Sequence, residues 1–275
     1  MNRHVFMILT LFSVLFFGGF SQKVMAKDAI PAHDSFDITS KALGEKRVIS
    51  VWKPSNYDQV DQRFPVLYMP DGGIDEDFPH IANTISELVE RGVIAPLLVV
   101  GIKNTDRYHD LTAPSKVAQD LEWLPTSGGS EAFRTFIRDE LIPEVETRYR
   151  VTAQRAIVGE SLAGLFVMEC FLREPGLFET HVAMDPSLWW NAQKLVGEAE
   201  QALANLPEGQ FTLWFAGSDA KDIYIHTTTL EKTLKKHAPK HLKWMYSPQP
   251  NEQHKTIFRA TKEQAFSWAL WRSEP

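Results

Sequence analysis

Residues 155–173 read RAIVGESLAGLFVMECFLR. Residues 156–158 are apolar and mostly β-branched, which predicts a buried strand, and the apolar spacing of residues 165–172 predicts a helix packed on a sheet. The sharp turn between them would lift the Ser161 hydroxyl clear of the sheet. This context around G-x-S-x-G is typical of a nucleophile elbow, here with Ala163 in place of the second glycine. The alternative is an ordinary strand–helix connection, and the flanking elements favour the elbow.

Outward from this turn, predicted strands and helices alternate along the chain. We expect strands at residues 36–39, 47–52, 64–69, 95–102, 156–158, 181–184, 211–215 and 242–246, and helices at residues 81–91, 131–149, 165–172, 192–203, 227–237 and 262–271. Residues 103–130 indicate a polar loop, and Pro143 predicts a break in the longest helix. The pattern indicates an α/β fold, with a mainly parallel central sheet and helices on both faces. No linker divides residues 27–275, so we expect a single domain there.

The first residues have the layout of a secretory signal peptide. Arg3 gives a basic start, residues 5–20 are almost wholly apolar, and Val24-Met25-Ala26 resembles a cleavage signal before Lys27. An uncleaved membrane anchor is the alternative, but the apolar run is shorter than the ~20 residues that span a bilayer. We therefore expect residues 1–26 to be removed and the mature protein to be periplasmic or secreted, with no membrane attachment.

Charge and cysteine content narrow the range of partners. The chain has 275 residues and a formal charge of -6, and removal of Arg3 and Lys23 with the signal peptide makes it -8. An acidic protein is poorly suited to nucleic acid or an anionic membrane, so neither is an expected partner. The single cysteine, Cys170, excludes an intramolecular disulfide, and its apolar neighbours indicate a packed core thiol.

A serine nucleophile needs a histidine base and an orienting acid, in the chain order Ser, acid, His. His254 is the candidate base because it lies in a polar loop directly after the last predicted strand. Asp219, which follows the strand at residues 211–215, ranks first as the acid by a small margin. Three other carboxylates stay open: Asp222 near the next helix, Asp185 directly after the strand at residues 181–184, and Glu252 beside the base.

The oxyanion hole is expected to combine two backbone amides. The Leu162 N–H follows the nucleophile, and Gly72 or Gly73, in the turn after the strand at residues 64–69, would supply the second donor. These two glycines fit a plain turn equally well. The neighbouring acids lack the spacing of a calcium loop, and zinc, phosphate-loop and dinucleotide motifs are absent, so no metal and no cofactor is implied.

Four segments together resemble the putative esterase family of α/β-hydrolases. They are VLYMPDGG at residues 66–73, RYHDLTAP at residues 107–114, GESLAGLF at residues 159–166 and DPSLWW at residues 185–190. The resemblance runs from about residue 34 to residue 271. That family includes enterochelin-type siderophore esterases, S-formylglutathione hydrolases, feruloyl and acetyl esterases, and mycolyltransferases.

The resemblance implies an α/β-hydrolase fold with Ser161 as nucleophile and His254 as base. The acid is the least regular element of the family, and some members work with a weak or absent third residue, which leaves the role of Asp219 open. Trp189 and Trp190 would line the substrate pocket, or else pack in the core.

We therefore expect an exported serine esterase that acts on a small-molecule ester through an acyl-enzyme on Ser161. Siderophore esters, aryl esters and acetylated sugars fit the sequence alike. Two alternatives stay open: a non-catalytic binding protein that keeps the hydrolase fold, and an acyltransferase that uses the same residues with an acceptor other than water.

Overall fold

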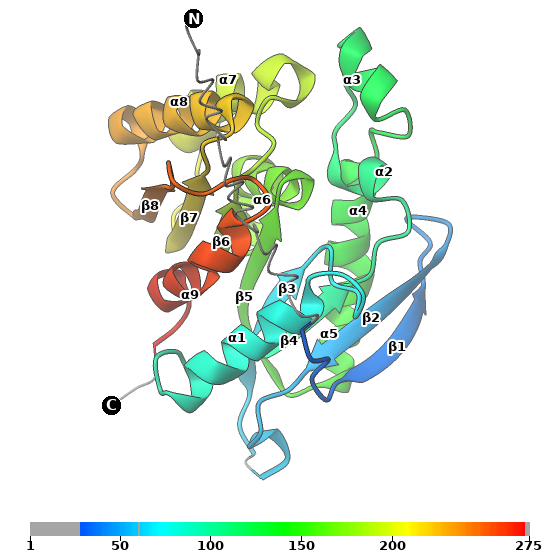
Figure 1. The fold of residues 1–275 in the computed structure, drawn as a ribbon. Coiled ribbons are helices and arrows are strands. Elements are labelled where there is room, and N and C mark those ends of the chain that lie inside the picture. The colour runs from blue at the N-terminus through cyan, green and yellow to red at the C-terminus, as the bar shows by residue number, and fades with distance from the viewer. Residues whose placement is uncertain (1–27, 60, 273–275) are drawn as a thin grey trace, which may run out of the picture.

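Eight runs rich in apolar and β-branched residues pair into one sheet in the computed structural model, which describes residues 28–59 and 61–272 (Figure 1). The strands are β1 (Asp34–Thr39), β2 (Lys46–Trp52), β3 (Phe64–Met69), β4 (Leu98–Ile102), β5 (Val151–Glu160), β6 (Thr180–Met184), β7 (Phe211–Gly217) and β8 (Leu242–Pro248). Their order is β1-β2-β4-β3-β5-β6-β7-β8. Strands β1 and β2 pair antiparallel, as do β2 and β4, while every pair from β4 to β8 is parallel. The predicted α/β fold with a mainly parallel sheet is confirmed.

Both faces of the sheet are covered, because successive strand residues point to opposite sides. On β3, Tyr68 belongs to one apolar cluster and Leu67 to the other, and Ile157 and Val158 on β5 divide in the same way. Helices α1 (Phe78–Glu90) and α9 (Ile257–Ala269) pack on one face, which is turned toward the viewer in Figure 1. The other face is covered by α4 (Ser130–Phe136), α5 (Ile142–Arg148), α6 (Leu162–Arg173), α7 (Trp190–Ala204) and α8 (Lys221–His237).

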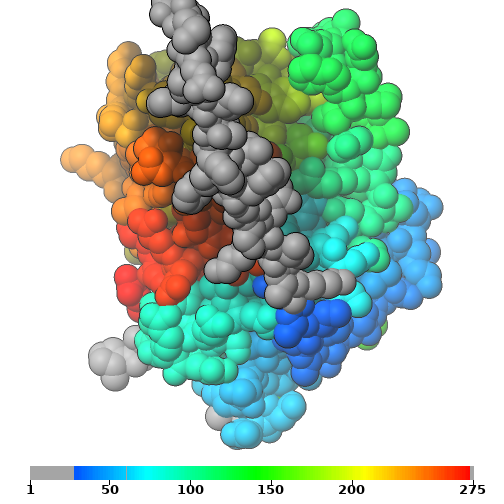
Figure 2. Space-filling model, in the orientation of Figure 1, coloured from blue at the N-terminus to red at the C-terminus, as the bar shows by residue number. Residues whose placement is uncertain are grey.

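The expectation of a polar loop over residues 103–130 is wrong. This segment forms α2 (Arg107–Leu111) and α3 (Ala118–Trp123). Helices of five and six residues are too short to show an apolar period, which is the signal that sequence analysis uses. In the space-filling view the segment projects from the upper right of the molecule, in green (Figure 2).

The helix expected at residues 131–149 is interrupted near Pro143, as predicted. A π-helical segment, η2 (Ile137–Leu141), lies between α4 and α5, and Pro143 stands in the first turn of α5. Proline has no N–H to donate to the carbonyl four residues earlier, and its ring crowds that carbonyl. The wider π turn accommodates both effects before the α-helix resumes.

No helix within residues 28–59 and 61–272 is long and apolar enough to cross a membrane. The expected signal peptide, residues 1–26, lies outside the described residues, so its cleavage stays a prediction.

His181, on β6, is a fully buried histidine among aromatic rings. It lies edge-on to Phe171 at 5.2 Å and to Phe178 at 6.1 Å between ring centroids. Burial lowers the pKa of His181 to about 3, because desolvation disfavours the imidazolium.

We expect His181→Leu to make the fold less sensitive to acid. The folded protein keeps His181 neutral, whereas the unfolded chain takes up a proton below about pH 6.5. The free energy of unfolding therefore falls as the pH drops from about 6.5 toward 3, by up to about 1.4 kcal/mol per pH unit. Urea unfolding of the parent and the variant between about pH 4 and pH 7 measures this slope. Phe178→Leu is the control, because it alters the same core without removing a titratable group. Parallel stability profiles for the parent and His181→Leu would contradict the prediction.

Candidate active site

Four neighbouring strands bring polar side chains to one edge of the sheet. Ser161 directly follows β5, Asp185 directly follows β6, and Ser218 directly follows β7. The loop after β8 carries His254. Because β5, β6, β7 and β8 are neighbours and run parallel, their carboxyl ends meet at the same edge.

Ser161 sits on a strained turn between β5 and α6. Its backbone has φ 59° and ψ -117°, a conformation that costs a non-glycine residue about 1–3 kcal/mol. The Ser161 N–H donates to the Met184 carbonyl at 3.0 Å, which fixes the turn against the end of β6. A Cβ at Gly159 would lie 2.6 Å from the Ala163 carbonyl, so the turn requires glycine there. The structure thus has the geometry of the predicted elbow.

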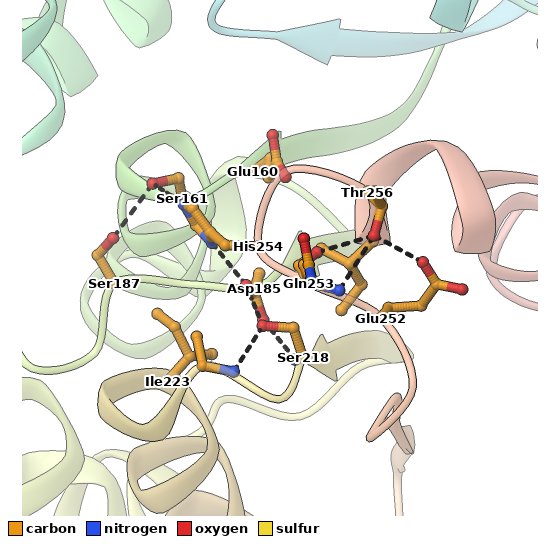
Figure 3. A network of polar contacts seen from close by, with 12 residues as sticks. Glu160, Ser161, Asp185, Ser187, Ser218, Ile223, Glu252, Gln253, His254 and Thr256 are labelled. Carbon is orange, nitrogen blue, oxygen red and sulfur yellow. Dashed lines mark hydrogen bonds and ion pairs between the residues drawn. The ribbon is translucent and has the colours of Figure 1, made fainter. Parts of the chain in front are cut away.

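A chain of hydrogen bonds links three side chains (Figure 3). His254 Nε2 lies 3.1 Å from Ser161 Oγ, and His254 Nδ1 lies 2.6 Å from Asp185 Oδ2. Because Nδ1 lies so close to the carboxylate, the neutral imidazole carries its proton on Nδ1 and donates it to Asp185. Nε2 is then free to accept the hydroxyl proton of Ser161. The arrangement matches that of a nucleophile, a base and an orienting acid.

The Asp185 carboxylate is completely buried yet well supplied with donors. The Ser218 backbone N–H donates to Oδ1 at 2.6 Å, and the Ser218 hydroxyl donates to Oδ2 at 2.8 Å. Together with the His254 contact these bonds give both carboxylate oxygens hydrogen-bond partners in a fully buried position. Asp185 itself has φ 47°, so its backbone is also strained.

The expectation that Asp219 contacts the base is wrong, because the structure places Asp185 there. Strand β6 lies between β5 and β7, so a carboxylate at its end stands nearer the nucleophile than one after β7. The Asp219 N–H instead donates to the Glu252 carbonyl at 2.9 Å, which joins its loop to the loop of the base. Asp222 lies in the first turn of α8, where a negative charge is favourable, and the Glu252 carboxylate accepts from Thr256 at 2.7 Å.

Neither glycine expected in the oxyanion hole has its amide available. The Gly72 N–H donates to the Ile102 carbonyl at 2.9 Å, and the Gly73 N–H donates to Glu76 Oε2 at 2.7 Å. The expected Gly72 and Gly73 donors are therefore wrong for this conformation. The Leu162 N–H, the first amide of α6, makes no hydrogen bond to any other described residue and remains the available donor.

Two residues beside the triad were not singled out from the sequence. The first is Glu160, directly before the nucleophile, and burial raises its pKa to about 7. The pKa of the neighbouring His254 is also raised above its usual value, chiefly by the hydrogen bond to Asp185. The second residue is Arg107. Arg107 binds Asp71 through Nε and Nη2, each at 2.7 Å, and its Nη2 lies 3.5 Å from the Glu160 carbonyl oxygen. Both residues lie in segments that the sequence analysis had singled out, RYHDLTAP and GESLAGLF. The sequence pattern did not indicate the contacts that they make.

The two tryptophans of the DPSLWW segment differ. Trp190 is buried, and its indole N–H donates to the Ala113 carbonyl at 2.8 Å, so it packs in the core. Trp189 is partly exposed and lies edge-on to Trp123 of α3, with ring centroids 6.1 Å apart. Of the two, only Trp189 is partly exposed to solvent, and its role in substrate binding stays a prediction.

A strained serine elbow with a Ser–His–Asp chain at the carboxyl edge of a mainly parallel sheet defines the α/β-hydrolase class. Comparison with known proteins places the chain within that class. It belongs to the family described as "Putative esterase", whose model matches residues 40–274.

Curated proteins similar to this chain include siderophore esterases. The chain is 34% identical to ferri-bacillibactin esterase BesA of Bacillus subtilis over 149 residues, 46% of this chain and 49% of that protein. It is 32% identical to the siderophore triacetylfusarinine C esterase of Aspergillus fumigatus over 97 residues, 34% of this chain and 31% of that protein. The chain thus spans about half the length of these curated relatives or less.

Solved structures show the same fold. An IroE-like serine hydrolase from Shewanella oneidensis superposes with a TM-score of 0.79 at 25% identity, over 86% of this chain and 79% of the other.

Proposed function

We propose that this chain is an exported serine esterase that hydrolyses a carboxylic ester through an acyl-enzyme on Ser161. The observation that carries the proposal is the pair of contacts made by His254, 3.1 Å from the Ser161 hydroxyl and 2.6 Å from the Asp185 carboxylate. Membership of the esterase family supports the same chemistry.

In the first half of the reaction, Ser161 Oγ attacks the ester carbonyl carbon while His254 Nε2 takes the hydroxyl proton. Asp185 stabilises the imidazolium that forms, and the Leu162 N–H donates to the developing oxyanion. The carbon–oxygen bond to the alcohol then breaks, and His254 returns its proton to the departing oxygen. In the second half, His254 removes a proton from water, which attacks the acyl carbon. The bond between the acyl carbon and Ser161 Oγ then breaks, His254 returns the proton to Oγ, and the acid is released.

The substrate class we favour is a siderophore ester, because the named relatives are esterases of siderophores. A panel that contains ferric and iron-free siderophore esters, aryl esters and acetylated sugars tests this, with the released acid and alcohol quantified by chromatography. We expect kcat/KM to be highest for the siderophore esters. Hydrolysis confined to acetylated sugars would contradict this assignment, and products formed only with an added alcohol acceptor would favour the acyltransferase.

Export is the second part of the proposal. The support is Arg3, the apolar run at residues 5–20 and Val24-Met25-Ala26. We expect protein recovered from the periplasm or the medium to begin at Lys27 when its N-terminus is sequenced. Recovery of the intact N-terminus in the membrane fraction would contradict cleavage and indicate an anchor.

A further inference from the structure

The Glu160 carboxylate stands beside the nucleophile without a partner. Glu160 is the last residue of β5 and directly precedes Ser161. Its side chain is partly buried and makes no hydrogen bond or ion pair with any other residue of the described chain, so Figure 3 draws no dashed line to it. Among the charged groups around it, His254 interacts with it most strongly. A carboxylate that burial removes from water is unfavourable while nothing pairs with it.

The two arginines that face Glu160 are already bound to other carboxylates. Arg107 of α2 binds both oxygens of Asp71 at 2.7 Å, and it reaches Glu160 only at the backbone carbonyl, at 3.5 Å. Arg259 of α9 binds both oxygens of Asp28, at 3.1 and 2.5 Å. Each guanidinium is therefore neutralised by its own partner, and neither donates to the Glu160 side chain.

The remaining charged groups around Glu160 are acidic. Asp71 and Asp77, in the loop between β3 and α1, and Asp185, after β6, all oppose its ionisation. His80 Nε2 lies 3.1 Å from Asp77 Oδ1, but burial lowers the pKa of His80 and keeps its ring uncharged at neutral pH. The potential beside the nucleophile is therefore negative whenever Glu160 is ionised.

A negative charge in this position disfavours the reaction of a neutral ester. Attack by Ser161 creates an oxyanion at the Leu162 N–H, and a like charge nearby raises the energy of that state. A positive charge on the substrate offsets the repulsion and gives the carboxylate the partner that the protein does not supply. The departing alcohol takes its proton from His254, the group that interacts most strongly with Glu160. The positive charge therefore belongs on the alcohol half of the ester.

We propose that Glu160 is a specificity-determining residue, which selects esters whose alcohol half carries a positive charge. The inference rests on the proposed esterase function and adds the charge of the preferred substrate. An alcohol that ends in an ammonium group pairs with the Glu160 carboxylate, and a neutral group of the same shape does not. An anionic group in the same place is repelled.

Choline acetate and neohexyl acetate test the proposal, because the two esters have the same shape and differ by one positive charge. At about pH 8 we expect the parent to show a kcat/KM about tenfold higher on choline acetate, and Glu160→Gln to bring the two values within about twofold of each other. Glu179→Gln is the matched control. It removes another partly buried carboxylate, directly before β6 at the opposite edge of the sheet, and should keep the ratio of the parent.

The preference of the parent should also disappear in acid. Glu160 loses its charge below its pKa of about 7, whereas choline is cationic at every pH, so the ratio should fall to within about twofold of one at about pH 6. Titration of His254 cancels in this ratio, because both esters use the same base. A ratio that does not change with pH would overturn the proposal. An equal loss of kcat/KM on both esters in Glu160→Gln would also overturn it, because Glu160 would then act only through His254.

Choline binding to the full-length Ser161→Ala protein, measured by calorimetry, gives a readout that does not depend on hydrolysis. At about pH 8 we expect Glu160→Gln in that background to weaken choline binding about tenfold. Unchanged choline affinity would overturn the proposal even if the parent proves to be an esterase. A parent that hydrolyses neither ester but binds choline through Glu160 would refute the proposed function and retain the charge selectivity.

Discussion

Ser161→Ala and His254→Ala are each expected to lower kcat on p-nitrophenyl acetate by about 10³-fold or more, with the fold intact. A serine hydroxyl at its ordinary pKa is a weak nucleophile, and the attack requires a base within hydrogen-bond reach. In this structure the group within hydrogen-bond reach of Ser161 Oγ is His254 Nε2, at 3.1 Å.

Because the two residues act as one unit, their effects should not add. The double variant should lose little more activity than either single variant, because the remaining rate comes from binding and the oxyanion donor. Steady-state kinetics on the three variants measure this, and circular dichroism checks the fold. Ser130→Ala is the control, because it removes a buried hydroxyl on α4 that has no hydrogen-bond partner among the described residues. Losses that multiply, or a His254→Ala protein of near-normal kcat, would contradict a Ser–His unit.

Asp185→Asn is expected to lower kcat by about 10³- to 10⁴-fold, because the amide cannot hold the imidazole in the productive tautomer or stabilise the imidazolium. Asp219→Asn and Asp222→Asn are the matched controls. Each removes a carboxylate from the loop or the helix start after β7, and each should retain kcat within a few-fold of the parent. An Asp219→Asn loss larger than that of Asp185→Asn would contradict the assignment of the acid.

The same variant should move the acid limb of the pH–rate profile. His254 must be neutral to act as a base, so kcat/KM rises as the pH passes upward through its pKa, which lies above the usual value in the parent. The hydrogen bond to Asp185 is the main cause of that increase. The acid limb of Asp185→Asn should therefore lie at lower pH than that of the parent. Glu160 has a pKa of about 7 and interacts electrostatically with His254, so Glu160→Gln in both backgrounds separates the contributions of the two groups.

Much of the fold followed from the sequence, because long apolar runs and their periods report burial directly. The strand at residues 64–69 was predicted with the observed bounds, and the elbow turn between β5 and α6 was recognised from its small residues. Helices α2 and α3 were not, since neither is long enough to display a period.

The sequence predicted the histidine of the candidate site but not the acid, because the choice of acid depends on the order of the strands in the sheet. His254 could be chosen because it follows the last strand, wherever that strand lies in the sheet. The choice between Asp219 and Asp185 required the knowledge that β6 stands beside β5. The availability of the Gly73 amide depended on the position of Glu76, which no local pattern encodes.

The most direct test of the central claim is covalent labelling of the active serine. A fluorophosphonate reacts with a serine only where a neighbouring base activates the hydroxyl. After incubation and digestion, mass spectrometry of the parent protein should show the phosphonyl adduct on Ser161, and the Ser161→Ala protein should carry none. A parent that stays unlabelled while hydrolysing no ester, or an adduct that persists in Ser161→Ala, would contradict the account.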